Sequence, residues 1–164
     1  MVSPVGERAL AAVRCADRVD VYHAQWAGSN DLLARVFDSR VEAVDVLAGV
    51  DWTHRGRYDP AAFPPVDALG VEAVYLLSAG GVRVYLPVWP GFSWPGDGVA
   101  GLLVRVGTLR ACRRLRWLVR FLKGLYHEAI ARGHIDARTA RRLLVLGLRS
   151  DCAPGQVHPP DTPL

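Results

Sequence analysis

Residues 108–132 read TLRACRRLRWLVRFLKGLYHEAIAR, and this stretch decides how the rest of the chain can be arranged. The spacing predicts one long helix, because apolar residues recur at steps of three or four and therefore share a face. We expect this face to pack on a core. Its members are Ala111, Leu115, Leu118, Leu122, Leu125 and Ala129.

Basic residues recur in the same stretch at the same spacing and predict a second stripe along the helix. Glu128 is the only acid among these residues. A helix with one apolar and one basic stripe can pack inward and still present positive charge to a partner. The basic stripe consists of Arg113, Arg116, Arg120, Lys123 and His127.

A second helix is predicted after Gly133, because Asp136 can cap its first turn and Ile135 precedes the cap as a hydrophobic staple. This helix should cover about 136–149 and run back along the first as a helical hairpin. The apolar positions predicted to face inward are Ala140, Leu143, Leu144 and Leu148, and the outward arginines are Arg138, Arg141, Arg142 and Arg149.

The positive charge of the chain is concentrated in this hairpin. Residues 1–100 hold eight Arg and twelve acids, a net charge of −4, whereas residues 101–150 hold eleven Arg and one Lys against two acids, a net charge of +10. Such a segment predicts a polyanionic partner, with nucleic acid as the first candidate and an acidic protein as the alternative. A solvated face, partly paired with the acids of residues 1–100, also remains open. The predicted contact residues are Arg113, Arg116, Arg120, Lys123, Arg138, Arg141 and Arg142.

The remainder of the chain predicts strands arranged in hairpins. Branched and aromatic residues at 71–89 surround Gly80 and Gly81, which suit a tight turn, and a second hairpin covers 8–26 with its turn at 15–18. A short strand at 102–106 and a helix near 30–40 complete the pattern, while 41–50 is ambiguous and 51–68 is expected to be a loop. The predicted strands lie mainly in the first part of the chain and the long helices in the last part, an order that indicates an α+β fold. We expect a small antiparallel sheet of two hairpins backed by the C-terminal helical hairpin.

Two clusters of polar and aromatic residues suggest an alternative function, a small-molecule enzyme or ligand-binding domain. A histidine and an amide at a strand end can serve acid–base chemistry or ligand binding, and an aromatic loop can stack on a ligand. Ordinary packing at the edge of a core is the favoured explanation of both clusters. No recognised catalytic motif is present, so we predict no catalytic residue. The first cluster is Tyr22, His23, Gln25 and Trp26, and the second is Trp89, Phe92 and Trp94.

The cysteines and the apolar runs exclude several classes of protein. Cys15, Cys112 and Cys152 are too far apart for a disulfide framework or a zinc site, and Cys112 is expected to be a small buried residue. No window reaches the length of a membrane helix, and the first residues lack the apolar run of a signal peptide. We therefore expect no metal or cofactor and a cytoplasmic protein, with one domain at 1–150 and a loose, proline-rich tail at 151–164.

Three short motifs carry a resemblance to a known family. They are Arg8-Ala9-Leu10, the segment VYHAQW at 21–26 and the segment LPVWPGF at 86–92. Together they resemble an uncharacterised family of small haloarchaeal proteins, over most of residues 7–150. The resemblance implies a compact single domain and no particular activity. Haloarchaeal cytosolic proteins are typically very acidic and this chain is basic, which implies that a polyanion or an acidic partner covers the basic segment.

Overall fold

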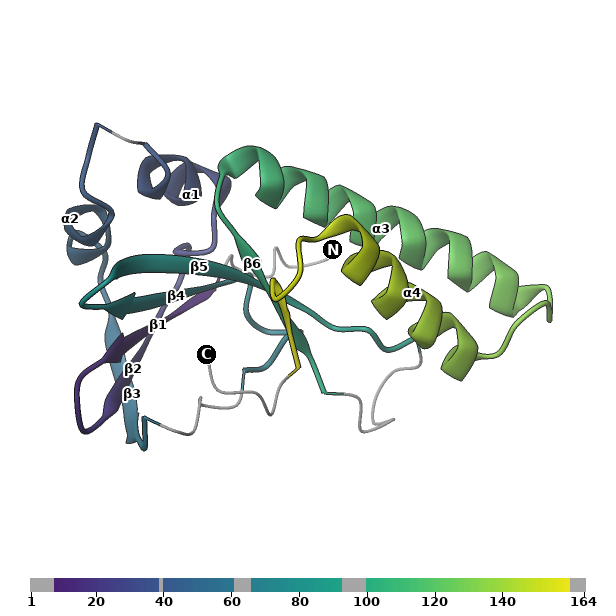
Figure 1. Ribbon diagram of the computed structural model, residues 1–164, viewed down its shortest axis with the longest axis horizontal. Helices are drawn as coiled ribbons and strands as arrows, with labels where there is room; N and C mark the ends of the chain where they lie inside the picture. Colours follow the sequence, from purple (N-terminus) through teal and green to yellow (C-terminus); the bar gives the residue numbers. More distant parts are fainter. Residues whose placement is uncertain (1–7, 39, 61–65, 93–99, 160–164) are drawn as a thin grey trace.

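One sheet with helices on one of its faces organises the chain (Figure 1). The computed structural model describes residues 8–38, 40–60, 66–92 and 100–159, and these contain seven strands and four helices. The strands are β1 (Ala9–Arg14), β2 (Val19–Ala24), β3 (Thr53–Tyr58), β4 (Ala73–Ser78), β5 (Gly81–Val88), β6 (Leu102–Val106) and β7 (Val157–His158), in the spatial order β3-β2-β1-β4-β5-β6-β7. The helices are α1 (Asn30–Val36), α2 (Ala43–Ala48), α3 (Leu109–Ala131) and α4 (Ala137–Asp151).

Both predicted hairpins form, and the mixed α and β content is confirmed. The β4–β5 turn brings Ser78 opposite Gly81. Gly81 has a φ of 98°, a backbone conformation that glycine adopts without strain. The prediction of a small, purely antiparallel sheet is wrong, because β1 pairs with β4 in parallel. A parallel pair needs a long crossover connection, and here the chain between the two strands passes through α1 and α2. Local sequence carries little information about such a pairing.

Strand β3 lies in the segment expected to be a loop, and it adds an edge to the sheet beside β2. Its sequence THRGRY has no apolar alternation, because most of its side chains are exposed at this edge. Charged residues are common on edge strands, where they discourage pairing with other chains. The hydrophobic pattern of the sequence therefore does not predict this strand.

The segment predicted as a helix near 30–40 begins with α1, which Ser29 caps by accepting a hydrogen bond from the Leu32 backbone N–H at 3.2 Å. The ambiguous residues that follow form a separate short helix, α2. Trp52 ties the end of α2 to the start of β3, because its indole N–H donates to the Leu47 carbonyl at 2.8 Å.

Part of the segment expected to be a loose tail is structured. Strand β7 pairs with β6, bringing Val157 opposite Val104 and His158 opposite Leu103. The exposed edge of β6 offers backbone groups that need partners, and the half-buried Val157 packs against the core. The remaining residues of the tail, 160–164, lie outside the described residues.

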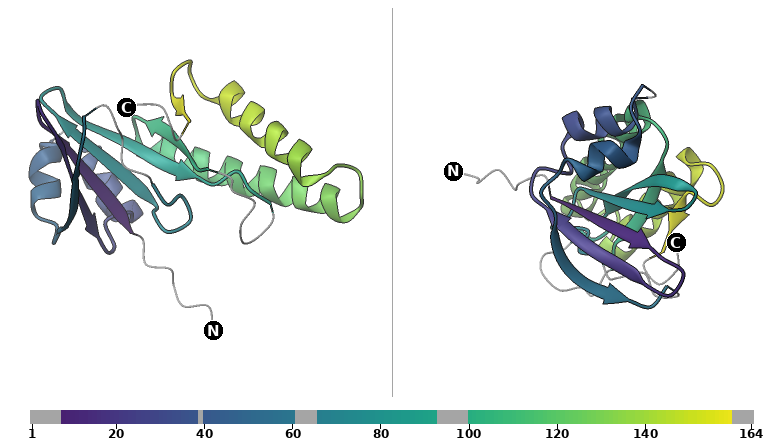
Figure 2. Two further views of the ribbon diagram at one scale, coloured as in Figure 1. Left: turned by 90° about the horizontal axis from the view of Figure 1, so that it is seen from below. Right: turned by 90° about the vertical axis from the view of Figure 1, so that its left-hand side faces the viewer.

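All four helices pack on the same face of the sheet, as the end-on view shows (Figure 2). Alanines on this face of the strands, at positions 9, 11, 24 and 73, leave room for the helices. The buried Tyr75 belongs to the same core between sheet and helices, and its hydroxyl donates a hydrogen bond to the Ala27 carbonyl at 2.7 Å. A second cluster, including Val74, Leu76 and Tyr85, forms on the opposite face.

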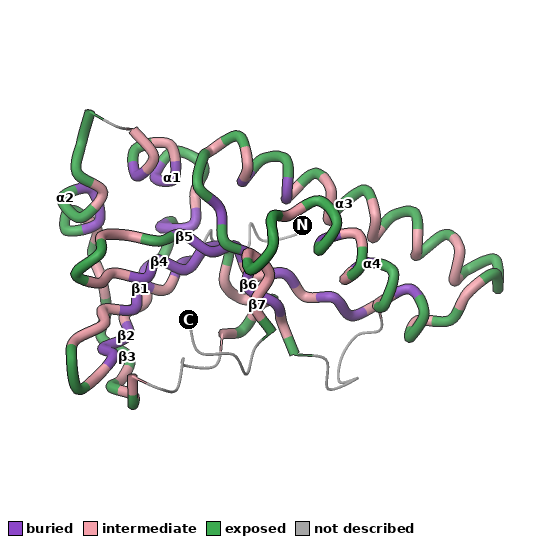
Figure 3. Tube along the Cα trace, in the orientation of Figure 1, coloured by how far each residue is buried: buried purple, intermediate pink, exposed green. Residues whose placement is uncertain are grey.

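Helix α3 has the predicted limits but not all of the predicted burial. Its buried residues are Cys112 and Leu115, both in the first half, and burial raises the pKa of the Cys112 thiol to about 11. Leu125, expected to face the core, is 52% exposed. The reason is visible in Figures 1–3: the far part of the α3–α4 hairpin extends beyond the sheet, so it has no core to cover.

Candidate anion-binding surface

The helical hairpin is fixed at its start and at its bend by caps that the sequence supplies. Thr108 accepts a hydrogen bond from the Ala111 N–H at 3.1 Å, and Asp136 accepts one from the Thr139 N–H at 2.6 Å. Between the helices Gly133 adopts a φ of 71°, and the His134 N–H closes the end of α3 by donating to the Ala129 carbonyl at 2.9 Å. These caps hold the arginine-rich helices in a defined antiparallel arrangement.

Arg116, predicted to face outward, instead turns toward the body of the protein. Its guanidinium donates to the Asn30 side-chain oxygen at 2.6 Å and to the Gly28 carbonyl at 3.0 Å, and lies 3.6 Å from a Glu72 carboxylate oxygen. The Arg116 side chain is only 19% exposed. This arginine ties α3 to the segment before α1, so we place it in the scaffold.

Lys123 also contacts the protein body, where it meets the aromatic segment that follows β5. Its ammonium donates to the Gly91 carbonyl at 3.0 Å and lies 4.4 Å from the centroid of Trp89 and 5.6 Å from that of Phe92. Such cation–π contacts are favourable where the ammonium is partly desolvated. The structure therefore joins one predicted basic residue to two residues of the predicted aromatic cluster. The third, Trp94, lies outside the described residues.

Other arginines of the hairpin remain exposed. Arg113 and Arg120 project from α3, and Arg138 and Arg142 from α4. Within the described chain, Arg113, Arg120 and Arg142 make no hydrogen bond or ion pair. Their charge is available to a partner, unlike that of Arg116.

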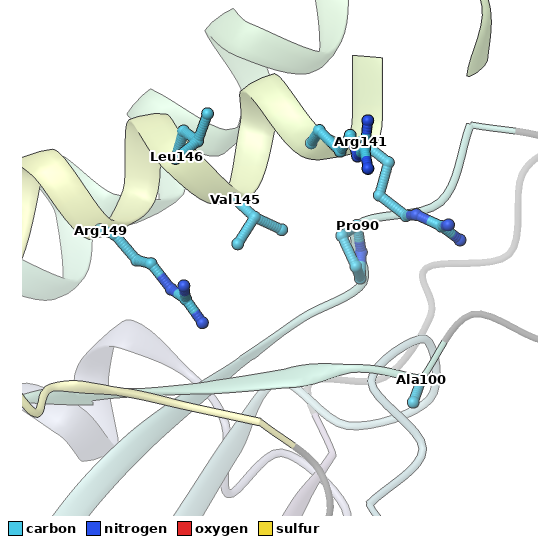
Figure 4. A pocket seen from close by; sticks show the side chains of 7 residues that line it. Pro90, Ala100, Arg141, Val145, Leu146 and Arg149 are labelled. Carbon is cyan, nitrogen blue, oxygen red and sulfur yellow. The ribbon is translucent and has the colours of Figure 1, made fainter. Parts of the chain in front are cut away.

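A cleft with a volume of about 710 Å³ lies under α4 (Figure 4). Its floor is apolar, with Pro90 and Ala100 from the strand ends and Val145 and Leu146 from α4. Figure 4 shows the Arg141 and Arg149 side chains leaving α4 on this side. Arg142 also lines the cleft. None of the three arginines has an acidic partner within the described part of the chain, so the cleft is lined by unneutralised positive charge.

The sequence predicts that Arg149 faces outward from the second helix, but does not place it among the contact residues. Its place in the cleft depends on segments distant in sequence, around Pro90 and Ala100. The regular spacing from Arg138 through Arg142 to Arg149 was the available signal.

A second, smaller cleft of about 210 Å³ lies between α3 and the end of β5. Arg120 and Arg116 line it together with Glu72, which lies 3.6 Å from Arg116. The carboxylate reduces the positive potential here. This cleft is a weaker candidate for binding an anion than the one under α4.

The four residues predicted as a cluster at the end of β2 make different contacts in the structure. Tyr22 packs edge-on against His54, with ring centroids 5.1 Å apart, while His23 lies 3.4 Å from the Arg55 guanidinium. Desolvation first, and the nearby charge of Arg55 second, lower the pKa of His23. Gln25 and Trp26 are exposed beyond the strand, and no residue of this cluster lines either cleft.

The sequence also gave no indication of an ion-pair cluster at the β2–β3 edge. The largely buried carboxylate of Asp20 accepts hydrogen bonds at 2.9 Å from both Arg57 and Arg18, and His54 Nε2 lies 3.6 Å away. Hydrogen bonds from Arg57 and then Arg18 lower the pKa of Asp20 to about 2. Neither cleft reaches this cluster, and its charges satisfy one another, so we interpret it as structural.

Two other features are absent from the described residues. These residues contain no group of three His, Cys, Asp or Glu side chains able to hold a metal ion. They also contain no helix that is long and apolar enough to cross a membrane.

Comparison of the chain with protein-family models, with curated proteins and with solved structures finds no match. The resemblance to small haloarchaeal proteins therefore stays a prediction from the sequence motifs.

Proposed function

We propose that this chain is a non-enzymatic binding module that contacts a polyanion, with nucleic acid as the first candidate, through the arginines of α4. The observation that carries the proposal is the cleft under α4, where Arg141, Arg142 and Arg149 gather without an acidic partner among the described residues. The concentration of positive charge in residues 101–150 supports the same surface.

The length of the basic surface favours a polymer over a small anion. From Arg138 to Arg149 the helix advances by about 16 Å at 1.5 Å per residue. Successive phosphates of a nucleic acid can meet arginines spread over such a distance, whereas a single phosphate can meet only one or two. Guanidinium groups also bind phosphate oxygens in a bidentate manner.

Binding should depend mainly on the phosphate backbone and only weakly on base sequence. The arginines contribute through release of counterions, and no described element matches a known base-reading motif. If about four phosphates are neutralised, the logarithm of the affinity should fall with the logarithm of salt concentration at a slope near −3 to −4.

The test is a salt titration of binding to generic RNA and to duplex DNA, comparing wild type with an Arg141/Arg142/Arg149→Ala variant. We expect the variant to bind more weakly and to show a slope shallower by about 2 to 3. The matched control is Arg35/Arg55/Arg83→Ala, which removes the same charge from exposed positions outside the hairpin. Arg116 is left intact in both variants, because its loss would disturb the scaffold.

Equal loss of binding in the two triple variants would show that net charge alone is responsible and would refute the α4 surface. Absence of binding to either nucleic acid at low salt would refute the proposal. Capture of an acidic protein that persists after nuclease treatment, with no nucleic-acid binding, would assign the same arginines to a protein partner.

A further inference from the structure

Large apolar side chains are exposed on the side of the helical hairpin that faces away from the sheet. Trp117 is 62% exposed, Phe121 53% and Leu125 52%, and Leu143 and Leu146 of α4 are also exposed. The Trp117 and Phe121 rings stack with an interplanar angle of 6° and centroids 5.3 Å apart. We call these five residues the outer patch.

The outer patch is continuous across the seam between the two helices. Arg114, two turns before Phe121, forms an ion pair with Asp151 of α4, so this side of α3 adjoins α4. On α4, Leu143 precedes Gly147 by one turn, and a Cβ at Gly147 would lie 3.0 Å from the Leu122 side chain of α3. The apolar residues of the two helices therefore lie side by side.

Gly124 lies on the exposed side of α3 beside this patch, three residues after Phe121. A glycine inside a helix is unfavourable relative to alanine, yet a Cβ at position 124 would meet no atom within 4 Å. The fold of the single chain thus gives no reason for the absence of a side chain here. Close packing of another helix against α3 does give one.

The charge beside the outer patch is only partly neutralised within the chain. Arg114 is paired with Asp151, and Arg132 with Glu128 at 2.7 Å. Arg113 and Arg120, which are exposed, border the patch one turn before and one turn after Trp117. The side chains of the patch itself are all apolar, so a partner for its centre needs apolar surface.

We infer that the outer patch is the contact surface for a second copy of this chain, with the two hairpins packed about a twofold axis as a four-helix bundle. The patch is self-complementary in composition, since the aromatic residues lie on α3 and the leucines Leu143 and Leu146 on α4. Antiparallel packing can place each set against the other. The five side chains offer on the order of 500 Å² of apolar surface, so two copies would bury about 1,000 Å², the lower end for a specific interface.

The shape of the patch agrees with this partner. Trp117, Phe121 and Leu125 are exposed and spaced by four residues, and such a row of side chains forms a ridge on a helix. Two helical hairpins can interdigitate such ridges, with a side chain of one copy seated over Gly124 of the other. The inference does not depend on the arginines proposed for polyanion binding, and Leu146 is the one residue of the patch that also lines the cleft under α4.

The test is the molar mass in solution, measured by light scattering and by sedimentation equilibrium at about 1 to 100 µM, a range that covers weak specific dimers. We expect wild type to approach twice the mass of one chain as its concentration rises. Phe121→Lys should remain monomeric, because it places a charge in the centre of the interface. Val44→Lys, with the same charge change at an exposed apolar residue of α2, should dimerise as wild type does.

Circular dichroism and thermal unfolding of both variants establish that they are folded, which is expected because each replaced side chain is exposed. Monomeric wild type over the whole range would overturn the inference, as would a Phe121→Lys dimer as tight as that of wild type. Monomeric protein that floats with phosphatidylcholine or phosphatidylglycerol vesicles, and loses this binding in Phe121→Lys, would overturn it in favour of a lipid surface.

Discussion

Two arginines of α3 show how far a residue's role depends on contacts that sequence spacing does not encode. Arg113 and Arg116 belong to the same predicted stripe, yet Arg113 is exposed and Arg116 is hydrogen-bonded to Gly28 and Asn30. These two hydrogen-bond partners lie more than eighty positions from Arg116 in the chain. Only the packing of α3 against the segment before α1 brings them together.

Replacing Arg116 by alanine should therefore lower the free energy of unfolding by about 1.5 to 3 kcal/mol, the range for hydrogen bonds to a charged group. Arg113→Ala is the matched control and should change it by less than about 0.5 kcal/mol, as for an ordinary surface substitution. Urea unfolding measures both values. Equal destabilisation by the two substitutions would show that Arg116 is not part of the scaffold.

Asp20 provides a test by pH. Its carboxyl has a pKa of about 2 in the folded protein, below its ordinary value of 3.8, because Arg57 and Arg18 donate hydrogen bonds to the charged form. A lowered folded-state pKa contributes stability that is fully present above the unfolded-state value and is lost as the pH falls toward 2. Asp20→Asn should thus be less stable than wild type at pH 7, and the difference should shrink between pH 4 and pH 2.

Thermal unfolding over this pH range measures the effect, with Asp31→Asn as a control on an exposed acid of α1. A stability difference between Asp20→Asn and wild type that does not change with pH would contradict the assignment.

At the scale of elements, the long regular segments were the most predictable. Helices α3 and α4, the two hairpins and β6 follow from periodicity, caps and turn residues, all of which are local signals. Strand β3 lacks such a signal because it is a polar edge, and β7 because it is two residues long. In the candidate site, Arg141 and Arg142, two of the three predicted contact arginines of α4, line a cleft. Part of its apolar floor comes from segments next to β5 and β6, which spacing on a helix cannot reveal.

Two glycines near or within α3 should respond in opposite ways to a methyl group. At Gly91 a Cβ would lie 2.2 Å from the Trp89 ring, which also receives the Lys123 ammonium. Gly91→Ala should destabilise the fold by about 1 to 3 kcal/mol, as overpacking does, and should alter tryptophan fluorescence. At Gly124 the space is open, so Gly124→Ala should stabilise α3 by about 0.5 to 1 kcal/mol.

The effect of Gly124→Ala on the free energy of unfolding should be measured in the Phe121→Lys variant, which is expected to be monomeric. In a monomer the substitution changes only the helix propensity of α3. In the wild-type background the gain should be smaller or reversed, since the added methyl group would meet the second copy. Identical gains in the two backgrounds would argue against close packing at Gly124. Chemical unfolding supplies all of these free energies.

At the scale of the whole molecule, the sequence indicates that positive charge is concentrated in the hairpin. It does not indicate which basic side chains face the protein body, which face solvent and which line a cleft. The structure places Arg116 and Lys123 against the protein body, leaves Arg113 and Arg120 exposed on α3 and directs Arg141 and Arg149 to the cleft under α4. The charge is thus distributed over separate surfaces with different roles. Residue counts and spacing give the total charge of the hairpin, whereas only the tertiary contacts show which surface each charged side chain occupies.

The parallel pairing of β1 with β4 has a consequence for the time course of folding. Ala9 pairs with Ala73, so β1 cannot complete its hydrogen bonds until a strand roughly sixty residues later is available. Pairings between residues so far apart in the chain slow folding, because loop closure precedes the gain from contact. During synthesis the β1 edge of the β1–β2 hairpin would stay unpaired until β4 emerges, and an open strand edge can pair with other chains and aggregate.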